Sequence, residues 1–216
     1  MKIVKRILIG LGVLLVVVSI GFVAWTRLAR HSAQAVAAAL ITPSTKSEQG
    51  WLVFKSDQPG DTGFIFYPGG LVDPVAYAPI AKGLADQGIE TIIVSMPLDL
   101  AIFGINTAGG VIAANPDIKH WIIGGHSLGG SMAAEYAARN SNTVQGLVFM
   151  AAYPATTTNL ANLPLKVISI YGSNDHVAAR SNVEDGLKRV PADTQFIVIE
   201  GGNHSQFGDY GQQSGD

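Results

Sequence analysis

The chain has 216 residues, of which 48% are hydrophobic and 14% charged, a balance that excludes a disordered protein and predicts one compact core. It contains no cysteine, which excludes a disulfide framework, a thiolate metal site and a cysteine nucleophile. The first thirty residues carry five basic and no acidic side chains, whereas residues 31–216 carry nine basic and sixteen acidic ones, a formal charge of −7. This acidic balance argues against nucleic-acid binding, which requires clustered Lys and Arg.

An uncharged apolar run of nineteen residues, Ile7 to Trp25, follows a basic N-terminus and is long enough to cross a bilayer as a helix. We interpret residues 1–30 as an uncleaved signal anchor that contacts the membrane through residues 7–25. The N-terminal basic residues favour a single-pass protein of the cell membrane with its domain outside the cytoplasm. The alternative is a secreted protein whose signal peptide is cleaved at Ala33-Gln34-Ala35, although the length of the apolar run favours the anchor.

Residues 31–49 are rich in Ala, Ser and Thr, and we expect them to form a tether to a domain spanning residues 50–216. In this domain, short β-branched runs alternate with helical or Ala-rich stretches, which is typical of an α/β fold with a mostly parallel sheet and helices on both faces. The expected strands are 51–54, 64–67, 91–95, 120–124, 144–150, 166–171 and 195–199. The expected helices are 74–87, 104–114, 128–139 and 177–189.

The segment Gly125-His126-Ser127-Leu128-Gly129 matches the motif G-x-S-x-G and stands between an expected strand and an expected helix. This context predicts that Ser127 lies on a sharp, strained turn, because the flanking glycines let the main chains of strand and helix pass closely. The positive end of the following helix would face a developing oxyanion. Ser127 is therefore the predicted nucleophile.

A serine hydroxyl needs a general base, and the base needs an orienting group. His204 lies in a Gly-rich loop after the last expected strand and is the predicted base, whereas His126 is expected to point away from Ser127. Asp175 follows the strand 166–171 at the same edge of the sheet and is the predicted acid. The alternatives are that His204 is a solvated loop residue and that Asp175 only caps a helix.

Main-chain N–H groups are expected to form an oxyanion hole. Leu128 supplies one of them, and the loop Pro68-Gly69-Gly70-Leu71 supplies the other, with Gly70 as the first choice and Leu71 as the second. The alternative is that Pro-Gly-Gly is simply a turn.

The Pro68-Gly-Gly loop with its following helix, the turn at 125–129, and then Asp175 and His204 occur in one order along the chain. In this it resembles the alpha/beta-hydrolase superfamily, within it the small lidless group that includes dienelactone-hydrolase-like esterases. The resemblance covers about residues 50–208 and implies that family's fold. Dienelactone hydrolases themselves use a cysteine, so their particular activity is not implied. The family usually has a helix where only twelve residues follow His204 here, which leaves a truncated C-terminus open.

The predicted function is hydrolysis of a small or medium carboxylic ester, or of a thioester or amide, through an acyl-enzyme on Ser127. A small-molecule ester is the expected partner, and no metal or organic cofactor is required. One alternative is cofactor-free perhydrolysis on the same triad. The other is a catalytically silent, membrane-tethered binding module with this fold, which an intact triad disfavours.

Overall fold

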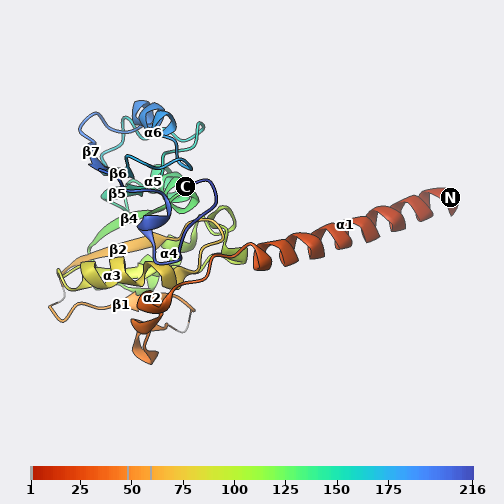
Figure 1. Ribbon diagram of the computed structural model, residues 1–216, viewed down its shortest axis with the longest axis horizontal. Helices are drawn as coiled ribbons and strands as arrows, with labels where there is room; N and C mark the ends of the chain where they lie inside the picture. Colours follow the sequence, from red (N-terminus) through yellow and green to blue (C-terminus); the bar gives the residue numbers. More distant parts are fainter. Residues whose placement is uncertain (1, 48, 59) are drawn as a thin grey trace. The chain divides into compact units, whose positions relative to one another are not determined.

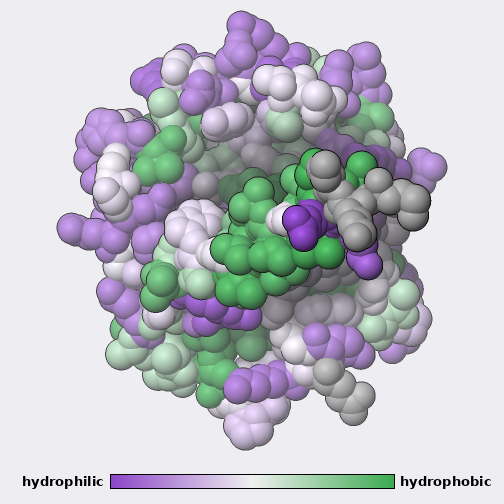
Figure 2. Space-filling model, turned by 90° about the vertical axis from the view of Figure 1, so that its right-hand side faces the viewer, coloured by the Kyte–Doolittle hydropathy of each residue, from purple (hydrophilic) through white to green (hydrophobic). Residues whose placement is uncertain are grey.

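The computed structural model describes residues 2–47, 49–58 and 60–216 and divides into two compact units, residues 1–30 and 31–216. The first unit is the helix α1 (Lys2–Leu28; Figure 1). An 18-residue stretch of it has a mean hydropathy of 2.9, so the helix is long and apolar enough to cross a membrane or to serve as a signal sequence. In the space-filling view it presents a largely apolar surface, whereas the visible face of the second unit is mostly hydrophilic (Figure 2).

A seven-stranded sheet with the strand order β1-β3-β2-β4-β5-β6-β7 forms the centre of the second unit (Figure 1). Its strands are β1 (Leu52–Phe54), β2 (Thr62–Tyr67), β3 (Glu90–Ile93), β4 (His120–His126), β5 (Gly146–Met150), β6 (Lys166–Gly172) and β7 (Gln195–Ile199). All neighbouring strands are parallel except β1 and β3, which are antiparallel. The expected mostly parallel sheet is confirmed.

Helices cover both faces of this sheet, as expected for an α/β fold. On one face, α3 (Ala78–Ala85), which continues from the 3₁₀ helix η2 (Pro74–Tyr77), packs its alanines against phenylalanines of β2. On the other face, α4 (Thr107–Ala114) and α5 (Leu128–Arg139) bury small side chains against β2, β4 and β5. The two apolar clusters therefore lie on opposite faces of one sheet.

The helix expected at 177–189 is interrupted. The chain first makes a turn, then forms α6 (Arg180–Gly186), and ends in the 3₁₀ helix η5 (Leu187–Arg189). The cause is the Asp175 carboxylate, which accepts the N–H groups of Val177 and Ala178 and thereby holds these residues in a turn. Shorter 3₁₀ helices occupy several connections: η1 (Pro43–Thr45), η3 (Pro97–Asp99), η4 (Ala101–Phe103) and η6 (Ser205–Phe207).

Residues 31–49 were expected to be a tether, but residues 31–47 of this segment pack on the domain. The N–H of His31 donates to the carbonyl of Leu71 at 2.7 Å. The short helix α2 (Ala35–Ala39) buries Ala37 completely, and the N–H of Ala37 donates to the carboxylate of Asp209 at 2.7 Å. The Ala-rich composition suits a buried helix as well as a tether, and the contacts with Leu71 and Asp209, distant in the sequence, decide between them.

Replacing Asp209 with Ala is expected to lower the free energy of unfolding by about 1–3 kcal/mol, because a hydrogen bond to a charged acceptor is lost and the Ala37 N–H is left without a partner. Urea unfolding of residues 31–216 would measure this change. The matched control is Asp193→Ala, which removes a carboxylate from an exposed ion pair with Lys166 and should change stability by less than about 0.5 kcal/mol. Equal stability of the two variants would contradict the packing of segment 31–49.

Candidate active site

Ser127 lies at the junction of β4 and α5 in a backbone conformation that L-residues rarely adopt, with φ 51° and ψ −124°. Its N–H donates to the carbonyl of Met150 at 3.0 Å, and its carbonyl accepts the N–H of Ser131 at 3.2 Å. These bonds stabilise a strained turn whose geometry projects the side chain from the carboxyl edge of the sheet. The sharp turn expected from the motif is present.

Two glycines make this turn possible. A Cβ atom on Gly125 would lie 2.3 Å from the carbonyl oxygen of Tyr67, and one on Gly129 would lie 2.1 Å from the same oxygen. Both distances are far shorter than any allowed van der Waals contact. The ends of β2 and β4 and the start of α5 therefore meet main chain against main chain, which only glycine permits.

His204 and Asp175 form a buried pair. The Nδ1 atom of His204 lies 2.9 Å from Oδ2 of Asp175, and their side chains are 1% and 0% exposed. The second oxygen of Asp175 accepts the N–H groups of Val177 at 2.9 Å and Ala178 at 2.7 Å. The carboxylate therefore orients the imidazole and caps the following turn at once, so the two interpretations of Asp175 do not compete.

The loops that carry these two residues pack directly on each other. A Cβ atom on Gly172, at the end of β6, would lie 2.1 Å from the carbonyl oxygen of Gly202. The N–H of Asn174 donates to that same carbonyl at 2.9 Å. The distance between His204 and Asp175 is therefore set by main-chain packing at a glycine.

Asp216 holds the other side of the histidine loop. Its Oδ1 accepts the N–H of His204 at 2.7 Å, and its Oδ2 accepts the N–H of Ser205 at 2.6 Å. These two hydrogen bonds fix the main chain that carries the His204 imidazole.

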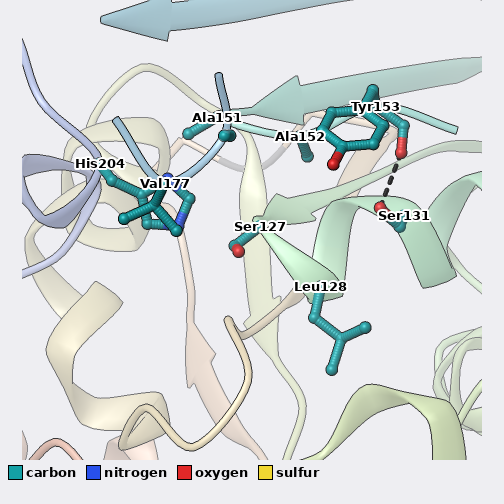
Figure 3. Close-up of a pocket in the computed structure, with 9 residues that line it drawn as sticks. Ser127, Leu128, Ser131, Ala151, Ala152, Tyr153, Val177 and His204 are labelled. Carbon is teal, nitrogen blue, oxygen red and sulfur yellow. Dashed lines mark hydrogen bonds between the residues drawn. The ribbon is translucent and has the colours of Figure 1, made fainter. Parts of the chain in front are cut away.

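Ser127 and His204 border one cavity of about 230 Å³ (Figure 3). The rest of its wall is small and mostly apolar: Leu128, Ser131, Ala151, Ala152, Tyr153, Val177 and Ala178. Within the described part of the chain, no hydrogen bond joins the Ser127 hydroxyl to the His204 ring. Such contacts are often long without substrate and shorten when it binds.

The loop after β2 contains one free main-chain donor next to the start of α5. The N–H of Leu71 donates to the carbonyl of Asp99 at 2.7 Å, so our second choice for an oxyanion donor is already occupied. Among the described residues, the N–H groups of Gly70 and Leu128 have no hydrogen-bond acceptor. A Cβ atom on Gly70 would lie 3.2 Å from the Leu128 side chain, so the two residues are neighbours.

A buried hydrogen-bonded pair next to the site was not predicted from the sequence. His126 is 1% exposed, its Nδ1 lies 2.9 Å from the Tyr77 hydroxyl, and its ring centroid lies 4.5 Å from that of His204. The only sequence signal was the position of His126 beside Ser127 in the motif. Burial, followed by the nearby His204, lowers the pKa of His126 well below 6.5, and burial raises the pKa of Tyr77.

The lowered pKa of His126 predicts a loss of stability in mild acid. Below pH 6.5 the unfolded chain binds a proton at His126 that the folded chain does not, so the free energy of unfolding falls as the pH falls. The contribution is up to about 1.4 kcal/mol per pH unit. Urea unfolding between pH 6.5 and 5 would measure it. The slope should decrease in His126→Asn, and an unchanged slope in that variant would contradict the assignment.

Comparison with solved structures gives the same fold. An alpha/beta hydrolase enzyme from a sediment metagenome of the Mar Chica lagoon is 17% identical with a TM-score of 0.62, over 74% of this chain and 89% of that one. A predicted CIB-like hydrolase from Thermoplasma acidophilum is 15% identical with a TM-score of 0.61, over 75% and 87%. A thermophilic esterase from Thermogutta terrifontis is 13% identical with a TM-score of 0.58, over 73% and 79%.

No curated protein matches the sequence significantly. The model of the alpha/beta hydrolase family matches residues 63–216, which include the Ser127 turn and both loops with Asp175 and His204. The chain belongs to the alpha/beta hydrolase family.

Proposed function

We propose that this protein is a serine hydrolase that cleaves carboxylic esters through an acyl-enzyme. The observation that supports the proposal is that Ser127 and His204 border one cavity, while the Asp175 carboxylate lies 2.9 Å from Nδ1 of His204. A base oriented by a buried carboxylate, beside a half-buried serine on a strained turn that borders the same cavity, is the arrangement that activates a hydroxyl nucleophile.

In the proposed mechanism, the Nδ1–H of His204 donates to Asp175, which leaves Nε2 as the proton acceptor. Ser127 Oγ forms a bond to the ester carbonyl carbon as its proton passes to Nε2. Collapse of the tetrahedral intermediate breaks the bond to the alcohol, which takes the proton from Nε2. A water molecule then releases the acid by the same two steps, with its proton returning through His204 to Ser127.

Two main-chain donors would stabilise the negative oxygen of the tetrahedral intermediate. The N–H groups of Gly70 and Leu128 have no acceptor among the described residues and lie on neighbouring segments. Leu128 also begins α5, so the positive end of that helix adds to the stabilisation.

The cavity favours a small acyl group. Its volume of about 230 Å³ is below the roughly 300–1,000 Å³ of pockets for drug-sized ligands, and alanines form much of its wall. The Thermogutta esterase has been solved with butyrate bound and also phosphoramylated by tabun. By analogy, we infer that short-chain esters are substrates of this chain and that organophosphorus probes label it.

We further propose that α1 is an uncleaved membrane anchor and that the hydrolase domain lies outside the cytoplasm. The length and hydropathy of α1 support a membrane span, and the basic N-terminal residues support the orientation.

A fluorophosphonate probe is expected to label the wild-type protein on Ser127. Labelling should be absent in Ser127→Ala and at least about 1,000-fold slower in His204→Ala, because the hydroxyl loses its base. Gel fluorescence would measure the rate, and mass spectrometry of the labelled peptide would identify the residue.

His176→Ala is the matched control for this experiment, since His176 stands beside Asp175 in the chain but does not border the cavity. It should be labelled at the wild-type rate. A folded wild-type protein that is not labelled would contradict the serine-hydrolase proposal and favour a binding module.

The small cavity predicts a preference for short acyl chains. We expect kcat/KM for p-nitrophenyl butyrate to exceed that for the decanoate by at least about ten-fold, because each methylene that cannot enter the pocket loses its share of binding energy. Initial rates over a series of acyl lengths would measure this. A flat or rising series would show that the cavity does not limit the acyl group.

A further inference from the structure

A buried chain of hydrogen bonds connects the loop after β2 to the residue before Ser127. The N–H of Gly69 donates to the Tyr77 hydroxyl at 3.0 Å, and that hydroxyl lies 2.9 Å from Nδ1 of His126. The Tyr77 and His126 side chains are 0% and 1% exposed. The proposed mechanism uses neither of them, yet both are polar groups buried at considerable cost.

The direction of each bond follows from the donor count. The Tyr77 oxygen accepts the Gly69 N–H, so its single hydrogen is free to point at His126. Burial raises the pKa of Tyr77 and lowers that of His126, so both groups are neutral. With the Tyr77 hydrogen pointing at Nδ1 of His126, Nδ1 is the acceptor and the hydrogen of the neutral ring is on Nε2, which is buried without a hydrogen-bond partner among the described residues. The hydrogen bonds therefore all point in one direction, from the Gly69 N–H through Tyr77 to His126.

These hydrogen bonds fix the peptide next to the proposed oxyanion donor. A Cβ atom on Gly69 would lie 2.7 Å from Nδ1 of His126 and 2.8 Å from the Tyr77 hydroxyl, so the two side chains press directly on the loop. On the other side, the Gly69 carbonyl accepts the N–H of Val72 at 3.2 Å, and Leu71 is tied to Asp99. The N–H groups of Gly69, Leu71 and Val72 all have acceptors, which leaves the Gly70 N–H available to a ligand.

The same histidine also contacts the proposed base. The rings of His126 and His204 lie 4.5 Å apart between centroids, and Phe207, from the histidine loop, stacks on His126 at 5.8 Å. His126 directly precedes Ser127 in the chain. The His126 ring thus contacts the loop after β2 and the loop that carries His204, and His126 itself belongs to the turn that carries Ser127.

We propose that Tyr77 and His126 are positioning residues that hold the Gly69–Gly70 peptide so that the Gly70 N–H faces the reacting carbonyl oxygen. This inference rests on the proposed hydrolase function. Neither residue touches the substrate, and both act through the main chain of the loop. Because the oxyanion forms only in the transition state, loss of the Gly69–Tyr77–His126 hydrogen bonds should lower kcat and leave KM nearly unchanged.

The test is hydrolysis of p-nitrophenyl butyrate by Tyr77→Phe. We expect kcat to fall by about 10- to 100-fold, less than the roughly 100- to 1,000-fold loss of a whole oxyanion donor, with KM within about two-fold. The control is Thr91→Val. The buried Thr91 hydroxyl donates to the Ile89 carbonyl at 3.1 Å, and Thr91 does not border the cavity.

Thr91→Val also loses a buried hydrogen bond and should unfold at a reduced temperature, with kcat within about three-fold of wild type. If both variants lose kcat in proportion to stability, Tyr77 has only a structural role and the inference is wrong. If Tyr77→Phe keeps the wild-type kcat, it is also wrong. If the wild type neither hydrolyses the ester nor reacts with a fluorophosphonate, the proposed function itself fails, which is a separate outcome.

A second pair of variants decides the question if Tyr77→Phe does not fold. His126→Asn keeps an acceptor near the Nδ1 position and should retain kcat within about five-fold, whereas His126→Leu fills the space without an acceptor and should lose about 10- to 100-fold. Equal activity of the two would overturn the inference. The ¹⁵N chemical shifts of wild-type His126 give an independent test, because the chain requires the Nε2–H tautomer and an Nδ1–H tautomer would contradict it.

Discussion

The close approach of main chain to main chain at the carboxyl edge of the sheet is the constraint on which the site depends. The carbonyl of Tyr67 at the end of β2 comes within 2.3 Å of where a Cβ would stand on Gly125 or Gly129. No other residue type allows this packing. It forces Ser127 into a left-handed conformation that costs about 1–3 kcal/mol, which the bonds to Met150 and Ser131 help to offset. The strain is the means by which a short side chain reaches the cavity.

Much of this architecture was predictable because it follows from local chemistry. Short β-branched runs mark the strands, the Ala-rich stretch Leu128–Arg139 is a helix over the expected residues, and G-x-S-x-G marks the junction between strand and helix. The fold of segment 31–49 could not be predicted in the same way. Its position depends on distant partners such as Asp209, 172 positions from Ala37 along the chain, and an Ala-rich composition does not indicate those partners.

The loop after β2 depends on distant contacts in the same way. The Pro68-Gly-Gly motif identifies the loop in which we expect an oxyanion donor, but the choice between Gly70 and Leu71 depends on which N–H already has an acceptor, and the N–H of Leu71 donates to Asp99. The contact of His126 with Tyr77 joins residues 49 positions apart. Sequence patterns identify candidates for reacting residues, because their chemistry is distinctive. Tyr77 and His126 are ordinary by type, and their contacts become visible only in the structure.

Asp175 and Asp216 together order the loop that carries His204. Asp175 accepts from His204 Nδ1 and from the N–H groups of Val177 and Ala178, so three donors surround one buried carboxylate. Asp216 accepts the main-chain N–H groups of His204 and Ser205. Asp175 therefore orients the imidazole ring of His204, and Asp216 holds the backbone that carries this ring. Since a misplacement of about 1 Å can cost an enzyme roughly 100-fold in rate, two carboxylates that fix one histidine suit the proposed role of His204 as the general base.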